Sequence, residues 1–313
     1  MKKSTTKTKK TLRIIAIVLL VYLLSQVVMT KIIYDAVFPR YDFTPEKLDV
    51  ALQAMVDERE LVSFYSGEYE LQGYYYTASE LQADSVVVIV PGLNAGADEY
   101  LNQIAYFVSD GFDVFAFDST GTCGSEGKSE IGFSQEVYDL DAALAYIGQS
   151  YDYEDVFLFG HSRGGYSTCA MLDGEHNLSA VASVSGLNSA MEAVMGLSGN
   201  YVGKLAYANY PLLWLYQCIL FDVETVQISA EECINSDNTP VLIVQGTQDD
   251  IAPMDAYSIY AHKDGITSGQ VEYYLCDKEG QNGHTDLMYD EADGSVNTEL
   301  MEEICQFYHE NER

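Results

Sequence analysis

Short apolar runs alternate with stretches of helical spacing along most of the chain. Runs without polar alternation, such as Ser85 to Val90 and Val156 to Phe159, are typical of strands covered on both faces of a parallel sheet. The pattern predicts strands at 61–65, 69–76, 85–90, 113–117, 156–159, 180–185, 241–245 and 271–275. It predicts helices at 45–58, 98–108, 135–147, 166–172, 254–262 and 298–311. This alternation indicates a doubly wound α/β sheet, and the two aromatic-rich strands at its start suit an antiparallel edge.

The first apolar run is longer than the others. No charged residue occurs from Ile14 to Thr30, and this length is near the minimum for a membrane-spanning helix, roughly 17 to 25 residues. A cleaved signal peptide is the alternative, but no small-x-small cleavage site follows the run. A third interpretation is a buried helix of a globular domain, but the basic residues before the run argue against it. Six Lys or Arg residues within the first thirteen predict that this end lies in the cytoplasm and that residues 35–313 lie outside.

Charge is distributed very unevenly around that run. The formal net charge is −32, but no Asp or Glu precedes Asp35, and from there on 48 acids face nine Lys or Arg residues, about −39. So acidic a body lacks the basic face that binding to nucleic acid requires. The six cysteines contain no Cys-x-x-Cys pair, so a zinc or thioredoxin-type site is not expected. Cys218 with Cys233, or Cys276 with Cys305, could pair in an oxidising compartment.

One strand ends in a turn that carries a candidate nucleophile. Directly after the apolar residues 156–159 comes Gly160-x-Ser162-x-Gly164, followed by Gly165 and a predicted helix. This is the pattern of a nucleophile elbow, a tight strand-to-helix turn that lifts a serine oxygen above the sheet. The N–H groups of the helix start point toward the place where negative charge develops in acyl transfer. The alternative is a tight glycine turn whose serine only caps a helix.

A long segment, about 187–239, interrupts the alternation of strands and helices. It separates two predicted strands with far more chain than a crossover needs, and it is rich in Met, Leu and Tyr. We interpret it as a helical cap packed over the elbow and lining the substrate pocket. The alternative is a peripheral helical pair that fills a small core of its own.

Downstream residues can complete a catalytic triad with Ser162. A serine needs a base, and the base needs an orienting carboxylate; in this type of fold they follow in the order serine, acid, histidine. The strand 241–245 is followed by Asp249 and Asp250, of which we prefer Asp249. His284, in a polar loop after the last strand, is the base that remains when the other four histidines are eliminated; His161, next to the serine, is expected to project away from it.

The tetrahedral intermediate also requires two N–H donors. One is expected from Arg163, the residue after the nucleophile, and the other from Leu93, with Asn94 as a possible substitute. The Arg163 side chain is a separate matter: we expect it to pair with a surface acid and give it no catalytic role.

These segments together resemble the α/β-hydrolase superfamily, in the branch of bacterial membrane-anchored serine hydrolases similar to esterase-lipase and peptidase S9-like domains. The resemblance rests on Pro91-Gly92, the loop 118–125, the elbow, Gly246-x-x-Asp249 and His284, and Pro91 stands where the family commonly has histidine. It implies hydrolysis of an ester, amide or thioester through an acyl-enzyme, without a metal or organic cofactor.

The resulting hypothesis divides the chain into four parts. Residues 1–13 form a basic cytoplasmic tail, 14–33 a single transmembrane anchor, 34–60 a connecting segment and 61–313 an α/β-hydrolase domain with its cap insertion. The expected activity is that of a serine esterase at the cell membrane acting on a small-molecule or peptide acyl substrate. A serine peptidase or amidase of the same fold, and a non-catalytic binding protein that kept the fold, are the alternatives.

Overall fold

The computed structural model describes residues 2–44, 48–78, 83–172, 174–203, 205–290 and 294–313. Its centre is an eight-stranded sheet in the order β1-β2-β4-β3-β5-β6-β7-β8. The β1/β2 and β2/β4 pairs are antiparallel, and all other pairs are parallel. The strands are β1 Glu60–Ser66, β2 Tyr69–Tyr76, β3 Ser85–Val90, β4 Asp113–Phe117, β5 Asp155–His161, β6 Ala180–Val184, β7 Val241–Gly246 and β8 Val271–Cys276. Every predicted strand is confirmed, including the antiparallel edge.

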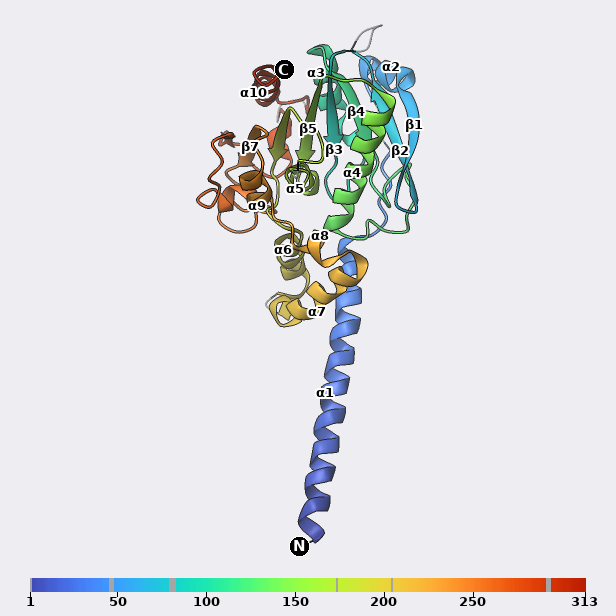
Figure 1. Ribbon diagram of the computed structural model, residues 1–313, viewed down its shortest axis with the longest axis vertical. Coiled ribbons are helices and arrows are strands. Elements are labelled where there is room, and N and C mark those ends of the chain that lie inside the picture. Colours follow the sequence, from blue (N-terminus) through green and yellow to red (C-terminus); the bar gives the residue numbers. More distant parts are fainter. Residues whose placement is uncertain (1, 45–47, 79–82, 173, 204, 291–293) are drawn as a thin grey trace.

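Helices cover both faces of this sheet (Figure 1). They are α1 Lys2–Val37, α2 Val50–Glu58, α3 Leu101–Ser109, α4 Phe133–Ser150, α5 Arg163–Ala170, α6 Ala190–Val202, α7 Leu205–Leu220, α8 Val223–Gln227, α9 Ala230–Ser236 and α10 Thr298–His309, with 3-10 turns η1 Ala97–Tyr100, η2 Ile259–His262 and η3 Asp286–Met288. Side chains of β3 alternate between two cores: Val86 and Val88 face the side of α4 and α5, whereas Val87 and Ile89 face the side of α3 and α10. Burial on both faces explains why this strand shows no polar alternation.

The helix predicted at 254–262 is much shorter in the structure. The segment 254–262 forms turns up to Tyr257 and only a 3-10 helix, η2, from Ile259. Ser258 makes an isolated antiparallel bridge with Leu187, and the Tyr257 carbonyl accepts the N–H of Asn188. These bonds to the start of the insertion occupy backbone groups that a continuous helix would use.

The long insertion between β6 and β7 forms the helices α6 to α9. In Figure 1 α6 and α7 lie at the end of the body where α1 leaves it, and α1 extends far beyond them as a single helix. The last part of α1 packs into the body, with Ile33, Tyr34 and Val37 buried. By length and composition, one helical segment in the described part of the chain is able to cross a membrane, Lys9–Val37. Such a segment is either a membrane anchor or a signal sequence.

Candidate active site

The turn after β5 has the strained geometry of a nucleophile elbow. Ser162 has φ 58° and ψ −113°, a conformation that L residues rarely adopt and that persists only where the surroundings impose it. A Cβ on Gly160 would come 2.3 Å from the Gly164 carbonyl oxygen, and one on Gly164 would come 2.0 Å from that of Val90. Both positions therefore exclude every residue except glycine. The turn holds Ser162 at the start of α5 with its side chain at the carboxyl end of the sheet.

The structure brings Ser162, His284 and Asp249 into one continuous chain of contacts. His284 Nε2 lies 2.8 Å from Ser162 Oγ, and His284 Nδ1 lies 2.8 Å from Asp249 Oδ2 and 3.0 Å from Oδ1. The three residues come from the ends of β5, β7 and β8, which meet at one edge of the sheet. Ser162 and Asp249 are only 7% and 6% exposed. The loop of His284 is docked on that of Asp249, since the N–H of Gln248 donates to the Asn282 carbonyl at 2.7 Å.

Asp249 is held as a carboxylate. Its Oδ1 accepts the N–H groups of Ile251 at 2.9 Å and Ala252 at 2.7 Å, and its Oδ2 accepts Gln245 Nε2 at 3.2 Å. Burial alone would raise the pKa of Asp249, but the hydrogen bond and charge of His284 and these two N–H groups lower it below its usual value. The other candidate, Asp250, is exposed to solvent. The geometry therefore matches the preference for Asp249.

Two residues that support the site, His161 and Tyr100, were missed by the sequence analysis. His161 was expected to project away from the serine, but its ring centroid lies 5.0 Å from that of His284 and it lines the same cavity. Its Nε2 lies 3.0 Å from the His284 carbonyl oxygen, and its Nδ1 lies 3.1 Å from the hydroxyl of Tyr100, which accepts the N–H of Gly92. Burial, and then the nearby charge of His284, lower the pKa of His161 to about 3. A neutral His161 thus links the loop of the base to the loop after β3.

The two expected oxyanion donors are the backbone N–H groups of Leu93 and Arg163. In the described residues, no hydrogen bond takes up the N–H of Leu93 or that of Arg163. The N–H of Asn94 is directed elsewhere, to the Glu130 carboxylate at 3.1 and 3.2 Å. Leu93 and Ser162 line the same cavity, so the free N–H of Leu93 fits the donor role better than that of Asn94.

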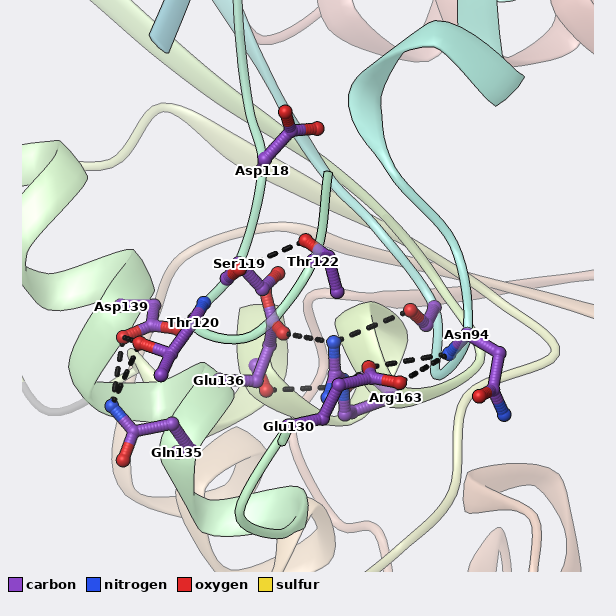
Figure 2. A network of polar contacts seen from close by, with 12 residues as sticks. Asn94, Asp118, Ser119, Thr120, Thr122, Glu130, Gln135, Glu136, Asp139 and Arg163 are labelled. Carbon is purple, nitrogen blue, oxygen red and sulfur yellow. Dashed lines mark hydrogen bonds and ion pairs between the residues drawn. The ribbon is translucent and has the colours of Figure 1, made fainter. Parts of the chain in front are cut away.

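The Arg163 side chain lies in a buried charge network, which corrects the expectation of a surface pair (Figure 2). Its Nη1 pairs with Glu130 Oε2 at 2.8 Å and its Nη2 with Glu136 Oε2 at 2.7 Å, and all three side chains are almost completely buried. Nη2 also donates to the Gly92 carbonyl at 3.3 Å. The guanidinium therefore connects the elbow to the loop of Leu93, both directly and through Glu130. No sequence signal revealed this, because Glu130 and Glu136 lie in a loop and at a helix start far from the elbow in sequence.

One arginine does not neutralise all the acids of this region. Asp139 is also fully buried and accepts the N–H of Thr120 at 2.7 Å and Gln135 Nε2 at 2.8 Å. Burial raises the pKa of Glu136 to about 8 despite the charge of Arg163, and it raises the pKa of Glu130 as well. Glu136 is therefore harder to ionise than an exposed glutamate, and its ion pair with Arg163 opposes this effect of burial.

A cavity of about 280 Å³ opens beside the triad. Its walls are mostly apolar and come from the loop after β3, from Phe133 on α4, from Leu187 and Leu197 of the insertion, and from Ile251 and Met288. Leu187 and Leu197 line the same cavity as Ser162, so part of the insertion lies beside the elbow. Among the described residues, no three His, Cys, Asp or Glu side chains gather in a way that could hold a metal ion.

Comparisons with known proteins agree with this architecture. Residues 82–217 match the family model described as serine aminopeptidase, S33. An esterase of Pyrococcus furiosus has a similar structure, with a TM-score of 0.65 and 16% identity over 88% of this chain and 98% of that one. Est1E of Butyrivibrio proteoclasticus, solved with ferulic acid bound, is also similar. Its TM-score is 0.57, with 16% sequence identity over 80% of this chain and 98% of that one.

A longer protein matches this chain over less than half of its own length. The acylaminoacyl peptidase of Pyrococcus horikoshii has a TM-score of 0.57 and 18% identity over 80% of this chain but 41% of that one. No curated protein sequence matches the chain. The sheet order, the elbow and these likenesses together show that the protein has the α/β-hydrolase fold.

Proposed function

We propose that the protein is a serine hydrolase that cleaves a carboxylic ester through an acyl-enzyme on Ser162. His284 Nε2 takes the proton of Ser162 Oγ as that oxygen attacks the ester carbonyl, and it returns the proton to the departing alkoxide. The ester C–O bond breaks and an acyl group remains on Ser162. A water then gives its proton to His284 and attacks the acyl carbonyl, releasing the acid and the free serine. Asp249 holds the imidazole in the required tautomer and stabilises the imidazolium.

The observation that carries this proposal is the unbroken relay from Ser162 through His284 to Asp249. The 2.8 Å contact between His284 Nε2 and Ser162 Oγ is within the range for direct proton transfer, and the 2.8 Å contact to Asp249 Oδ2 orients the imidazole. A serine that only capped a helix would need neither a strained elbow nor a histidine held by a buried carboxylate. The free N–H groups of Leu93 and Arg163 supply the donors that the developing oxyanion requires.

An ester fits the cavity better than a substrate with a free amine. The one carboxylate in the cavity wall is that of Glu99, and both of its oxygens already accept hydrogen bonds, from the Tyr41 hydroxyl at 3.0 Å and the Gly96 N–H at 2.8 Å. These two bonds take up part of the accepting capacity of Glu99, so it would hold a substrate ammonium group less tightly than a free carboxylate would. A serine peptidase or amidase is the second candidate, favoured by the description of the matching family model.

We extend the proposal to the cellular location of the protein. The apolar side chains from Leu12 to Leu24 are exposed along α1, and the basic flank precedes them. An uncleaved anchor with its basic end in the cytoplasm explains both facts and puts the hydrolase body outside. Protease added to intact spheroplasts should digest the body; protection of the body while cytosolic markers stay intact would contradict this topology.

Labelling with a fluorophosphonate probe tests whether Ser162 is a reactive nucleophile. The full-length protein should react and carry the tag on Ser162, and Ser162→Ala should abolish labelling. A folded protein that never reacts would favour the non-catalytic alternative. Turnover of acyl esters beside aminoacyl amides then separates esterase from peptidase.

A further inference from the structure

Helix α7 presents an uncharged surface outward. Its sequence, Leu205–Leu220, contains no charged residue, and the side chains that recur every fourth position, Tyr207, Pro211, Leu215 and Ile219, are all exposed. Tyr207 is 66%, Leu215 47% and Ile219 70% exposed. The opposite face packs inward, with Leu213 fully buried. A surface helix normally turns a polar face to water, so an apolar face on this side indicates a different neighbour.

The position of α7 beside α1 identifies that neighbour. The uncharged run of α1 ends at Thr30, whose Oγ1 accepts Asn209 Nδ2 of α7 at 2.9 Å in a buried contact. One turn further along α1, the ring of Tyr34 packs edge-on against that of Tyr216, with centroids 4.6 Å apart. The run of 17 residues, at about 1.5 Å each, nearly equals the thickness of the hydrocarbon core. The outer surface of a membrane spanned by α1 therefore lies level with the part of α7 between Asn209 and Tyr216.

Charge along the sequence agrees with this placement. Residues 193–221 form the longest stretch without Asp or Glu after Asp35, in a chain that carries 48 acids. The rest of the body is strongly acidic and would be repelled by an anionic lipid surface. The acids are thus absent from the part of the cap that lies beside the anchor, where a carboxylate would have to enter the lipid interface. Exposed tyrosines, as at 207 and 210, are typical of that interface.

We propose that the exposed face of α7 lies in the outer interface of the lipid bilayer and that the enzyme takes a long-chain carboxylic ester from it. The proposal rests on the proposed hydrolase function and on α1 as an anchor. Helix α6, which joins α7 to the body, contributes Leu197 to the wall of the apolar cavity beside Ser162. The helix pair α6 and α7 therefore links the proposed lipid contact to the wall of the cavity beside Ser162. The structure thus assigns the cap two tasks, contact with lipid and delivery of the acyl chain.

Depth-dependent quenching tests the contact with lipid. Trp214 is the only tryptophan, so it is replaced by Phe and a new tryptophan is placed at Leu215 on α7 or at Tyr65, an exposed residue of β1. Full-length variants are reconstituted into phosphatidylcholine and phosphatidylglycerol vesicles with brominated acyl chains. Bromine should quench the Leu215→Trp fluorescence and leave that of Tyr65→Trp unchanged. Equal quenching at both sites would overturn the contact with lipid. So would fluorescence that depends on the protein density in the vesicle and not on bromine, which is the result expected if a second copy covers this face.

Rates on two esters with one leaving group test the substrate class. 4-Nitrophenyl palmitate is carried in the vesicle and 4-nitrophenyl acetate is dissolved in water. Leu215→Glu and Ile219→Glu should lower the palmitate-to-acetate rate ratio about tenfold or more, since a carboxylate in the interface opposes docking, and Tyr65→Glu should not. An unchanged ratio in the α7 variants refutes delivery from the bilayer. Absence of Ser162-dependent acetate hydrolysis in every variant would instead contradict the proposed function, and the quenching result would still decide the contact.

Discussion

Replacing Arg163 by methionine separates the role of its side chain from that of its backbone. Methionine keeps the length and apolar stem of arginine but leaves Glu130 and Glu136 without their cation. All three side chains are at most 1% exposed, so no water replaces the lost ion pairs of 2.8 and 2.7 Å. Breaking a buried pair from one side costs about 3–5 kcal/mol. Against a total stability of about 5–15 kcal/mol the variant should still fold, with a melting temperature lower by roughly 10 °C.

The loss of stability in Arg163→Met should increase with pH. Burial raises the pKa of both glutamates, so the folded protein binds more protons than the unfolded chain, and this stabilisation is lost as the pH rises through the folded pKa, about 8 for Glu136. Without Arg163 the two carboxyls depend entirely on protonation to stay buried. Urea unfolding in detergent micelles should therefore show a larger difference from wild type at pH 8.5 than at pH 5.5. Glu136→Gln should lower stability less than Arg163→Met, because it leaves Arg163 paired with Glu130 whereas Arg163→Met leaves two buried carboxyls without their cation.

Turnover reports whether the network also supports the oxyanion site. Arg163 Nη2 holds the Gly92 carbonyl, and Glu130 holds the N–H of Asn94, so their loss should displace the N–H of Leu93 between them. Loss of one oxyanion donor lowers kcat by about 10²–10³-fold, with kcat/KM falling equally, because the contact exists only in the transition state. A folded Arg163→Met variant with wild-type stability at pH 8.5 and wild-type kcat would refute this reasoning.

Three further changes have expected outcomes. Asp249→Asn should lower kcat by about 10⁴-fold, whereas Asp250→Asn should be mild because Asp250 is exposed; steady-state kinetics of both variants would show the reverse if the acid were Asp250. Gly164→Ala should prevent a stable fold, since its Cβ would lie 2.0 Å from the Val90 carbonyl oxygen, and soluble, active protein in an expression trial would contradict the elbow geometry. Leu197→Ala should raise the relative rate on bulky acyl groups by enlarging the cavity; a uniform loss on all esters, in step with lost stability, would make the cap only structural.

Much of this fold could be predicted from sequence because its strongest signals are local. A strand buried on both faces must be largely apolar, as at positions 86–90, and a turn too tight for a Cβ must contain glycine, as at Gly160 and Gly164. The order serine, acid, histidine then left few candidates in a chain with five histidines. The residues of the proposed site could thus be selected from a local turn pattern and from chain order.

Features that depend on tertiary contacts could not be predicted in this way. The partners of Arg163 come from α4 and the loop before it, and nothing near the elbow indicates that two acids would be buried there. His161 has an ordinary position after a strand, and only the fold reveals its contacts with Tyr100 and His284. The helix expected at 254–262 has suitable spacing, but pairing with Leu187 and Asn188 takes up its first turns.

Turnover of a soluble activated ester by Ser162→Ala, by His284→Ala and by the double variant tests the central claim most directly. Folding of each full-length variant is checked by circular dichroism. The account predicts that each single change lowers kcat by about 10³-fold or more and that the double variant is hardly slower than either, because neither residue works without the other. A folded Ser162→Ala variant that retains most of the activity, or losses that multiply in the double variant, would contradict it.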